Sequence, residues 1–203
     1  MALDKGYVME QFHHPRAVMN GRGTAARPTP QREWLLSGIS GRVVELGAGD
    51  GTKLACYPPG LDEIVIVEAD PSLRQAAREA ASSVSSPVRV VDGSLTRLPF
   101  PDDFADVVIC SLMLCSSPRP DATLAEVRRV LRRDGELRFY EHTRSFNPVV
   151  AFAEGLITPV WAPACGGCHP ARDPLGAIEK VFAIRRLERF SFDHVAHVMG
   201  VAT

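Results

Sequence analysis

Residues 42–51, Arg-Val-Val-Glu-Leu-Gly-Ala-Gly-Asp-Gly, constrain the fold more than any other stretch of the chain. An apolar run stops here at three glycines spaced two residues apart, which predicts a buried strand that ends in a tight loop. Glycine has no Cβ, so such a loop can adopt positive φ and let a ligand lie against its backbone. In an open α/β sheet, ligands bind beside the carboxyl end of the first strand. The stretch therefore predicts an α/β fold with a nucleotide-type cofactor site.

The residues around these glycines exclude two common cofactor loops. The dinucleotide fingerprint G-x-G-x-x-G requires glycine three residues after Gly49, but Thr52 stands there. The phosphate-binding loop G-x-x-x-x-G-K-S/T is excluded as well, because the chain contains no Gly-Lys-Ser/Thr. An ordinary glycine turn without a ligand is the alternative that this pattern leaves open.

The length and charge of the chain narrow the class of protein. With 203 residues, it is long enough for one α/β domain with a substantial core. Its net charge of −1 and its pI near 6.6 give no electrostatic footprint for nucleic acid, so we expect a small-molecule partner. Its five cysteines, an odd number scattered among apolar residues, argue against a disulfide framework. Residues 1–7 have no apolar core of signal-peptide length, so we expect a cytoplasmic protein. The sequence leaves its oligomeric state open.

Three more apolar runs predict strands of the same sheet: residues 63–68, 88–91 and 104–111. Glu68 ends the first run, and a carboxylate there would accept hydrogen bonds from both hydroxyls of a ribose. The other two runs lead into further candidate ligand contacts: Asp92, Gly93, Ser94, Ser111 and Leu112. Asp106 lies near the opposite end of its strand, so we expect it to have a structural role.

Capping signals predict helices between the strands. Asp70 and Pro71 are typical of an N-cap and a first helical position. An amphipathic helix is expected over residues 121–133 with Asp121 as its cap, followed by a strand over residues 136–141. Shorter helices are expected elsewhere: residues 30–38 and 173–182.

Several segments resemble, in sequence and order, the class I S-adenosylmethionine (SAM) methyltransferases of the methyltransferase-11 type. They are Val-Val-Glu-Leu-Gly-Ala-Gly-Asp-Gly (43–51), Val-Glu-Ala-Asp-Pro (67–71), Val-Asp-Gly-Ser (91–94), Leu-Pro-Phe-Pro-Asp-Asp-Phe-Ala-Asp-Val-Val (98–108) and Glu-Val-Arg-Arg-Val-Leu-Arg-Arg-Asp-Gly-Glu (126–136). The resemblance implies a SAM-dependent enzyme with a single Rossmann-like α/β domain. It also implies a seven-stranded, mostly parallel sheet with helices on both faces, in which one of the last two strands, over residues 183–190 and 194–203, is antiparallel.

The family resemblance assigns a part of SAM to each candidate contact. The amino-acid and ribose parts would lie against the backbone of Gly47, Ala48 and Gly49. Glu45 or Asp50 would help to hold the cationic amino group. Glu68 and Ala69 would bind the ribose. Asp92, Gly93 and Ser94 would bind the adenine, and Ser111 and Leu112 would lie at the sulfonium.

A narrower resemblance links the chain to a subgroup that includes the membrane-bound alkyl thiol methyltransferases and many bacterial proteins. It rests on Tyr-Pro-Pro-Gly (57–60), Ser-Leu-Met-Leu-Cys-Ser (111–116), Tyr-Glu-His (140–142) and Gly-Cys-His-Pro-Ala-Arg-Asp (167–173). S-methylation of a small thiol is therefore the first expectation. Two departures from the subgroup are expected to matter: we expect no N-terminal membrane helix, so a lipidic acceptor is not implied, and residues 169–172 lack the usual leucine and threonine. O-, N- or C-methylation, or a SAM-binding module without activity, are the alternatives.

The acceptor pocket is expected in the second half of the chain. Residues 149–164 are its most apolar stretch, but a spanning helix needs roughly 20 residues, so no membrane span is expected. We expect a helix and a broken turn, with Phe152 and Trp161 as pocket walls. His142 and His169 are the candidate general bases for the acceptor's proton, with a structural role as the alternative for each.

Residues 165–169, Cys-Gly-Gly-Cys-His, match C-x-x-C-H, the pattern of covalent haem attachment. Haem attachment needs an export route, and a zinc site needs a fourth ligand that the sequence does not reveal. The subgroup resemblance explains Gly-Cys-His without a metal, so we expect none.

The N-terminal residues 1–30 combine isolated apolar residues with turn-forming ones, typical of a short helix and a linker. Such a segment could close over the site as a lid, with Tyr7, His13 or His14 reaching the acceptor; a mobile tail or surface helix is the alternative. The methyltransferase domain is expected to span residues 31–203.

Overall fold

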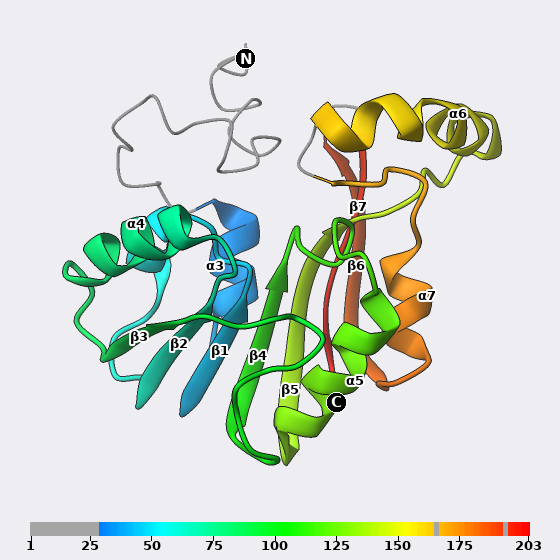
Figure 1. Cartoon of the computed structure of the whole chain (residues 1–203). Coiled ribbons are helices and arrows are strands. Elements are labelled where there is room, and N and C mark those ends of the chain that lie inside the picture. The colour runs from blue at the N-terminus through cyan, green and yellow to red at the C-terminus, as the bar shows by residue number, and fades with distance from the viewer. Residues whose placement is uncertain (1–28, 165–166, 193–194) are drawn as a thin grey trace.

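The computed structural model describes residues 29–164, 167–192 and 195–203, so the predicted lid residues 1–28 lie outside it. Its strands form one seven-stranded sheet of order β3-β2-β1-β4-β5-β7-β6 (Figure 1). They are β1 (Arg42–Leu46), β2 (Glu63–Val67), β3 (Val88–Val91), β4 (Ala105–Ser111), β5 (Leu131–His142), β6 (Ile184–Phe192) and β7 (Val195–Ala202). β1 to β5 pair in parallel, whereas β7 is antiparallel to β5 and β6. The predicted sheet is confirmed.

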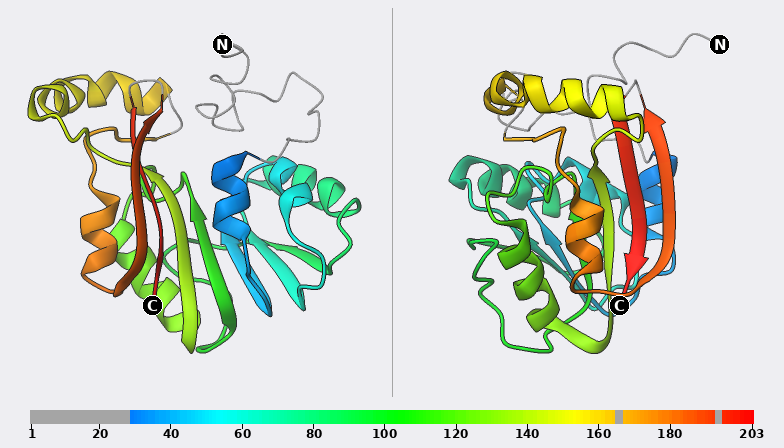
Figure 2. Two further views of the ribbon diagram at one scale, coloured as in Figure 1. Left: turned by 180° about the vertical axis from the view of Figure 1, so that it is seen from behind. Right: turned by 90° about the vertical axis from the view of Figure 1, so that its right-hand side faces the viewer.

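Helices cover both faces of the sheet, as the two views of Figure 2 show. On one face lie α5 (Pro120–Val130) and α7 (Pro174–Glu179). On the other lie α3 (Pro30–Leu36), the 3-10 helix η1 (Thr52–Cys56) and the end of α4 (Pro71–Ala81). The remaining described helix, α6 (Pro148–Ala164), lies above the carboxyl ends of β5 and β6 (Figure 1).

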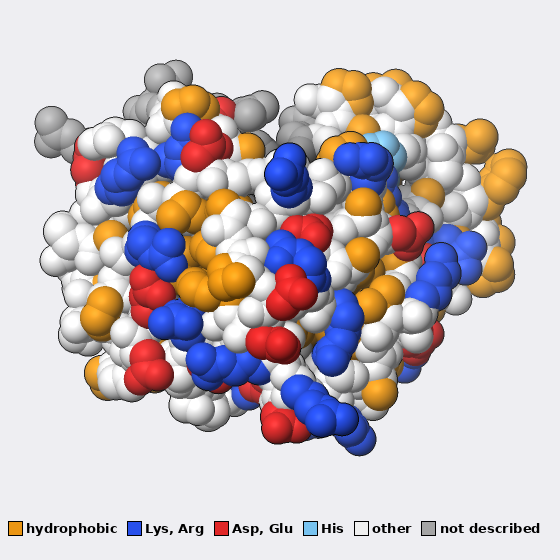
Figure 3. All heavy atoms as spheres, turned by 60° about the horizontal axis from the view of Figure 1, so that its bottom comes forward, with side chains coloured by type: hydrophobic (Ala, Val, Ile, Leu, Met, Phe, Trp, Pro, Cys, Tyr) orange, Lys and Arg blue, Asp and Glu red, His pale blue; other side chains and the backbone are white. Residues whose placement is uncertain are grey.

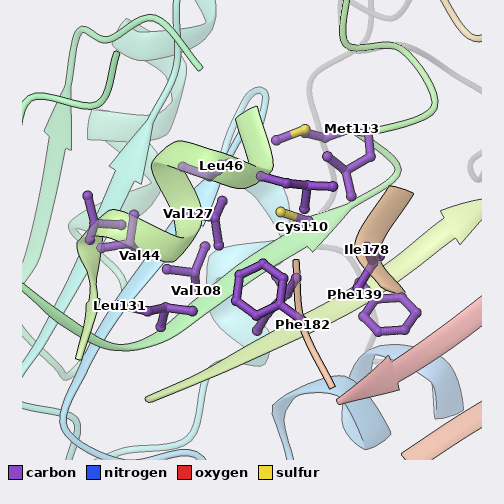
Figure 4. Packing of buried hydrophobic residues seen from close by; sticks show 14 of the residues in the cluster. Val44, Leu46, Val108, Cys110, Met113, Val127, Leu131, Phe139, Ile178 and Phe182 are labelled. Atoms are coloured by element: carbon purple, nitrogen blue, oxygen red, sulfur yellow. The ribbon is translucent and has the colours of Figure 1, made fainter. Parts of the chain in front are cut away.

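The core of the protein has two parts, one on each face of the sheet. Successive side chains of a strand point to opposite faces, so Val43 and Val44 of β1 enter different parts. Val44 belongs to the cluster of Val127 and Leu131 shown in Figure 4, and Val43 belongs to the cluster of Leu35. Because each side chain of this size stabilises the fold by about 1.5–3 kcal/mol when buried, both faces hold β1 in place.

The structure corrects both ends of the helix predicted over residues 121–133. The N-cap of α5 is Arg119, which makes no capping side-chain bond, and Asp121 lies in the first turn with its side chain 74% exposed. The next strand begins at Leu131 rather than at residue 136, because Leu131 pairs with Ala105 of β4 and is buried there. The sheet pairing, not the helical pattern, therefore ends α5.

Two predicted aspartate roles agree with the structure, those of Asp70 and Asp106, and Asp173 has a capping role that was not predicted. Asp70 caps α4, its Oδ1 accepting hydrogen bonds from the N–H groups of Ser72 at 2.9 Å and Leu73 at 3.2 Å. Asp173 caps α7 in the same way, although this helix ends at Glu179 rather than at residue 182. Asp106 accepts the N–H of Arg42 at 2.7 Å, so it links the amino-terminal ends of β1 and β4.

Basic and acidic side chains intermix on the face at the amino-terminal end of the parallel strands (Figure 3). Arg132 pairs with Asp106 at this end of the sheet, and Arg42 pairs with Glu63 at 3.0 Å. These charges therefore form local ion pairs with one another.

Helix α6 differs from the expected helix and broken turn, because it is continuous through Pro159 and Pro163. It exposes large apolar side chains, among them Phe152 at 70% and Val160 at 79%. Phe152 lines an open hollow of about 390 Å³ beside Arg144, so it is not the wall of an enclosed pocket, whereas Trp161 is half-buried. In the described part of the chain, no helix combines the length and the apolar character needed to cross a bilayer.

Candidate functional site

The glycine loop follows β1 with the backbone conformation that the sequence predicts. Gly47, Gly49 and Gly51 have φ of +66°, +64° and +76°, values that residues with a Cβ rarely adopt. A Cβ on Gly51 would lie 2.8 Å from the Cα of Ala77 in α4. The third glycine therefore lets α4 pack directly on the loop.

Glu68, the predicted ribose ligand, lies against this loop. Its Oε2 accepts a hydrogen bond from the Gly49 N–H at 3.1 Å, and its Oε1 accepts one from the Asp70 N–H at 2.9 Å. Only 9% of the residue is exposed. The carboxylate thus joins the end of β2 to the loop after β1.

The predicted adenine contacts lie at the end of the neighbouring strand, β3. Arg74 of α4 donates hydrogen bonds to the carbonyl of Ala69 at 2.6 Å and to Asp92 Oδ1 at 3.0 Å. A Cβ on Gly93 would lie 2.8 Å from the side chain of Val67, so residues 92–94 turn closely over β2. Ser94 Oγ lies 3.1 Å from Thr96 Oγ1 within this turn. The ends of β2 and β3 therefore adjoin.

Glu45 makes an ion pair that the sequence did not indicate. Both of its oxygens accept hydrogen bonds from the Arg32 guanidinium at 2.9 Å, and Oε2 also accepts the Tyr57 hydroxyl at 2.6 Å. Burial by itself would raise the pKa of Glu45, but the charge of Arg32 and the hydrogen bonds from Arg32 and Tyr57 together outweigh it and leave the pKa lowered. The carboxylate thus anchors α3 to β1, and its contact with the SAM amino group stays a prediction. Asp50, the alternative, accepts the Thr52 N–H at 3.1 Å.

Glu141 in β5 is a second residue that the sequence reasoning missed. Its fully buried carboxylate accepts three backbone hydrogen bonds, from Met113 at 3.1 Å, Leu114 at 3.0 Å and Cys115 at 3.1 Å. Burial raises its pKa, and the three N–H groups only partly oppose this effect. The signal for this role was its place in Tyr-Glu-His, beside the loop after β4.

Residues 112–117, here called the β4 loop, carry the predicted sulfonium contacts. Ser111 ends β4 opposite Tyr140, and Leu112 has φ of +55° with its N–H bonded to the Tyr140 carbonyl at 2.7 Å. A Cβ on Gly47 would lie 3.3 Å from the Met113 side chain. The glycine loop and the β4 loop therefore approach each other closely, and they bring the predicted cofactor contacts to one edge of the sheet.

A second loop, residues 167–172, packs on the β4 loop. Arg172 donates hydrogen bonds to the carbonyls of Leu114 at 3.2 Å, Cys115 at 3.0 Å and Ser117 at 2.6 Å. The His169 N–H bonds to the Cys115 carbonyl at 3.1 Å. His169 Nδ1–H donates to the Gly167 carbonyl at 2.6 Å, so in a neutral ring Nε2 is the basic nitrogen.

The other candidate base, His142, turns toward two cysteines. Its Nδ1 lies 3.2 Å from Cys168 Sγ, and one donor atom each of Cys115, His142 and Cys168 lie within 4.8 Å of one another. A hydrogen bond with Cys115 lowers the pKa of Cys168 to about 5, with burial opposing and His142 and Trp161 assisting. Cys165, the first cysteine of the C-x-x-C-H pattern, lies outside the described residues. The second cysteine, Cys168, lies beside Cys115.

His197 in β7 packs beside this cluster. It is paired with His142 across the β5–β7 ladder, and the two ring centroids lie 4.6 Å apart. Burial and the neighbouring His142 lower the pKa of His197 to about 4. The ring is therefore neutral at physiological pH, and it packs against both Tyr140 and Phe190.

Comparison with known proteins agrees with this geometry. The profile of the family described as "Methyltransferase domain" matches residues 44–139. The thiol S-methyltransferase TMT1B of Rattus norvegicus is 31% identical over 180 residues, which cover 83% of this chain and 73% of that protein. The human TMT1B is 31% identical over 191 residues, covering 88% and 78%. The crystal structure of BH2331 from Bacillus halodurans superposes with a TM-score of 0.68 at 16% identity, covering 79% of this chain and 91% of the other.

Proposed function

Because this chain belongs to the class I SAM-dependent methyltransferases of the methyltransferase-11 type, we propose that it transfers the methyl group of SAM to the sulfur of a small thiol. The thiol S-methyltransferases among its relatives support sulfur as the methylated atom, because their similarity extends over most of both chains. One observation carries the proposal: the β4 loop, which bears Cys115 and accepts the His169 N–H, lies so near the glycine loop that a Cβ on Gly47 would be 3.3 Å from Met113.

SAM would lie across the carboxyl ends of β1 to β4. The backbone of Gly47, Ala48 and Gly49 can approach it closely, because these residues form a loop with left-handed glycines. Glu68 would exchange its backbone partners for the ribose hydroxyls, and residues 92–94 would border the adenine. Asp50 would hold the amino group, since Arg32 and Tyr57 already engage Glu45.

The chemistry asks the protein mainly for alignment. The sulfonium methyl is already activated, so the site has to place the acceptor sulfur in line with it and exclude water. A thiol must also lose its proton to become a good nucleophile. His169 is the better placed base, because its Nδ1–H is fixed by Gly167 and its Nε2 can accept a proton.

Two measurements test this function. Isothermal titration with SAM should show one binding event, and labelled SAM should transfer its methyl group to alkyl thiols in preference to phenols and amines. Transfer only to phenols, amines or carbon acids would replace the thiol with that acceptor. Binding of SAM without transfer to any acceptor would instead favour a SAM-binding module.

A further inference from the structure

Two buried thiols and one buried imidazole meet beside the candidate active site, and the proposed mechanism gives none of the three a task. Cys115 comes from the β4 loop, His142 from the end of β5 and Cys168 from the loop 167–172. Their exposed fractions are 1%, 7% and 6%. In the part of the chain that the structure describes, they are the one group of three His, Cys, Asp or Glu residues whose donor atoms lie within 4.8 Å of one another.

The backbone around this cluster is held independently of the three side chains. Glu141 accepts the Cys115 N–H at 3.1 Å, while Arg172 donates to the Cys115 carbonyl at 3.0 Å. His142 is held in the sheet by its pairing with His197. The donors therefore come from a rigid frame, as a preformed metal site requires.

The donor set matches one class of ion. Two thiolates and an imidazole suit zinc, whose bonds of about 2.3 Å to sulfur and 2.0–2.1 Å to nitrogen put tetrahedral donors about 3.5–3.8 Å apart. The observed separations, 3.2 Å between His142 Nδ1 and Cys168 Sγ and at most 4.8 Å within the group, bracket these values. Three protein ligands with an open fourth position are typical of catalytic rather than structural zinc.

We propose that Cys115, His142 and Cys168 bind one zinc ion, and that its fourth position takes the sulfur of the acceptor thiol. The metal part stands on the cluster alone, whereas the acceptor part rests on the proposed thiol methylation. It replaces the expectation of a metal-free site, which considered Cys165 and Cys168 but not Cys115, a residue distant in sequence.

The step balances as follows. The two cysteines release their thiol protons to solvent when zinc binds, and the acceptor R–SH gives its proton to His169 as the zinc–sulfur bond forms. A sulfur lone pair of the bound thiolate then attacks the SAM methyl carbon. The bond from this carbon to the sulfonium breaks, and its electron pair stays on S-adenosylhomocysteine. The product is a neutral thioether, which binds zinc weakly and leaves in exchange for water.

Cobalt(II) reports on the metal part, because it replaces zinc in tetrahedral sites and shows thiolate charge-transfer absorption. The purified full chain, reduced with a phosphine, should bind one equivalent of Co²⁺ with this absorption, and Zn²⁺ should displace it. Cys115→Ser and Cys168→Ser should each weaken Co²⁺ binding at least ~10-fold. Cys56→Ser is the matched control, since Cys56 is half-buried in η1 and outside the cluster. Absence of stoichiometric binding by the unaltered chain would overturn the site even if a variant failed to fold.

The acceptor part has its own readout. Addition of 2-mercaptoethanol to the cobalt-loaded protein should shift the absorption, because a third thiolate enters the coordination sphere. An unchanged spectrum would overturn this part. Full thiol methylation by protein shown to be zinc-free would overturn the inference and leave the proposed function intact. A thiol-sensitive cobalt spectrum without methyl transfer would support the metal site while contradicting the proposed function.

Discussion

Arg32 and Glu45 form a two-bonded ion pair in the interior, with both N–O distances at 2.9 Å and side chains 6% and 3% exposed. The pair joins α3 to β1 directly before the glycine loop. Tyr57, the residue directly after η1, also donates a hydrogen bond to this carboxylate at 2.6 Å. The segment after η1 is therefore held to the same ion pair. The position of the glycine loop therefore depends on a buried ion pair outside the loop.

Removal of one partner of this pair should strongly destabilise the fold. Arg32→Met leaves the Glu45 carboxylate buried without its counterion, which typically costs about 3–5 kcal/mol. The double change of Arg32→Met with Glu45→Gln should cost less than the sum of the single changes. Urea denaturation measures both, with Lys180→Met as control because Lys180 and Asp121 are 71% and 74% exposed. If Arg32→Met and the control lost the same free energy of unfolding, the ion pair would not be needed to stabilise the fold.

The same pair predicts the acid sensitivity of the fold. The folded-state pKa of Glu45 is lowered, so its stabilising contribution is fully present above the unfolded pKa of about 4.3. That contribution is lost as the pH falls from there through the folded-state pKa. The difference in free energy of unfolding between the native chain and Glu45→Gln should therefore shrink as the pH is lowered from 5 toward about 3. A difference independent of pH would show that the carboxylate has an ordinary pKa.

Gly51→Ala should be more harmful than an alanine at another left-handed glycine. Gly60→Ala, at φ of +85° with open space around its Cβ position, should lose only about 1–2 kcal/mol from backbone strain. Gly51→Ala has the same strain at φ of +76° and also meets the Ala77 backbone at 2.8 Å. It should unfold at lower urea concentration than Gly60→Ala and bind SAM at least ~10-fold more weakly. Similar urea midpoints and similar SAM affinities for both variants would mean that α4 shifts to accommodate the added methyl group at little cost.

Glu68→Gln should weaken SAM binding while leaving most of the stability in place. The amide is uncharged and has one acceptor oxygen, so it cannot offer each ribose hydroxyl an oxygen of its own. We expect the Kd for SAM to rise at least ~10-fold, since charge-assisted bonds contribute about 1.5–3 kcal/mol each. Calorimetry gives the value, and Glu79→Gln on the exposed side of α4 is the control. An unchanged Kd would remove Glu68 from the cofactor site.

His169→Gln should lower the rate of methyl transfer without affecting cofactor affinity. A general base typically contributes 10²–10⁴-fold, so kcat with a thiol acceptor should fall by about 10²-fold. The Kd for SAM should stay within about twofold, because His169 forms its hydrogen bonds in the described chain with Cys115, Gly167 and Arg172, which lie outside the glycine loop. A normal kcat at neutral pH would show that the thiol loses its proton by another route.

The parts of this protein that are visible in its sequence depend on short-range physics. Three glycines after an apolar run require a left-handed loop, and Asp70 before Pro71 begins a helix, because backbone sterics and capping act within a few residues. Strand pairing is less local. Leu131 fits a helix or a strand by its own pattern, and its pairing with Ala105 places it in β5.

The amino-acid sequence by itself therefore determined the α/β fold, most of the strands and the loops that carry the predicted cofactor contacts. Only the tertiary structure decided which partners those residues have: Arg32 for Glu45, three N–H groups of the β4 loop for Glu141, and Cys115 for Cys168. These contacts join residues far apart in the chain, and the sheet order and loop packing that bring them together leave no local pattern in the sequence.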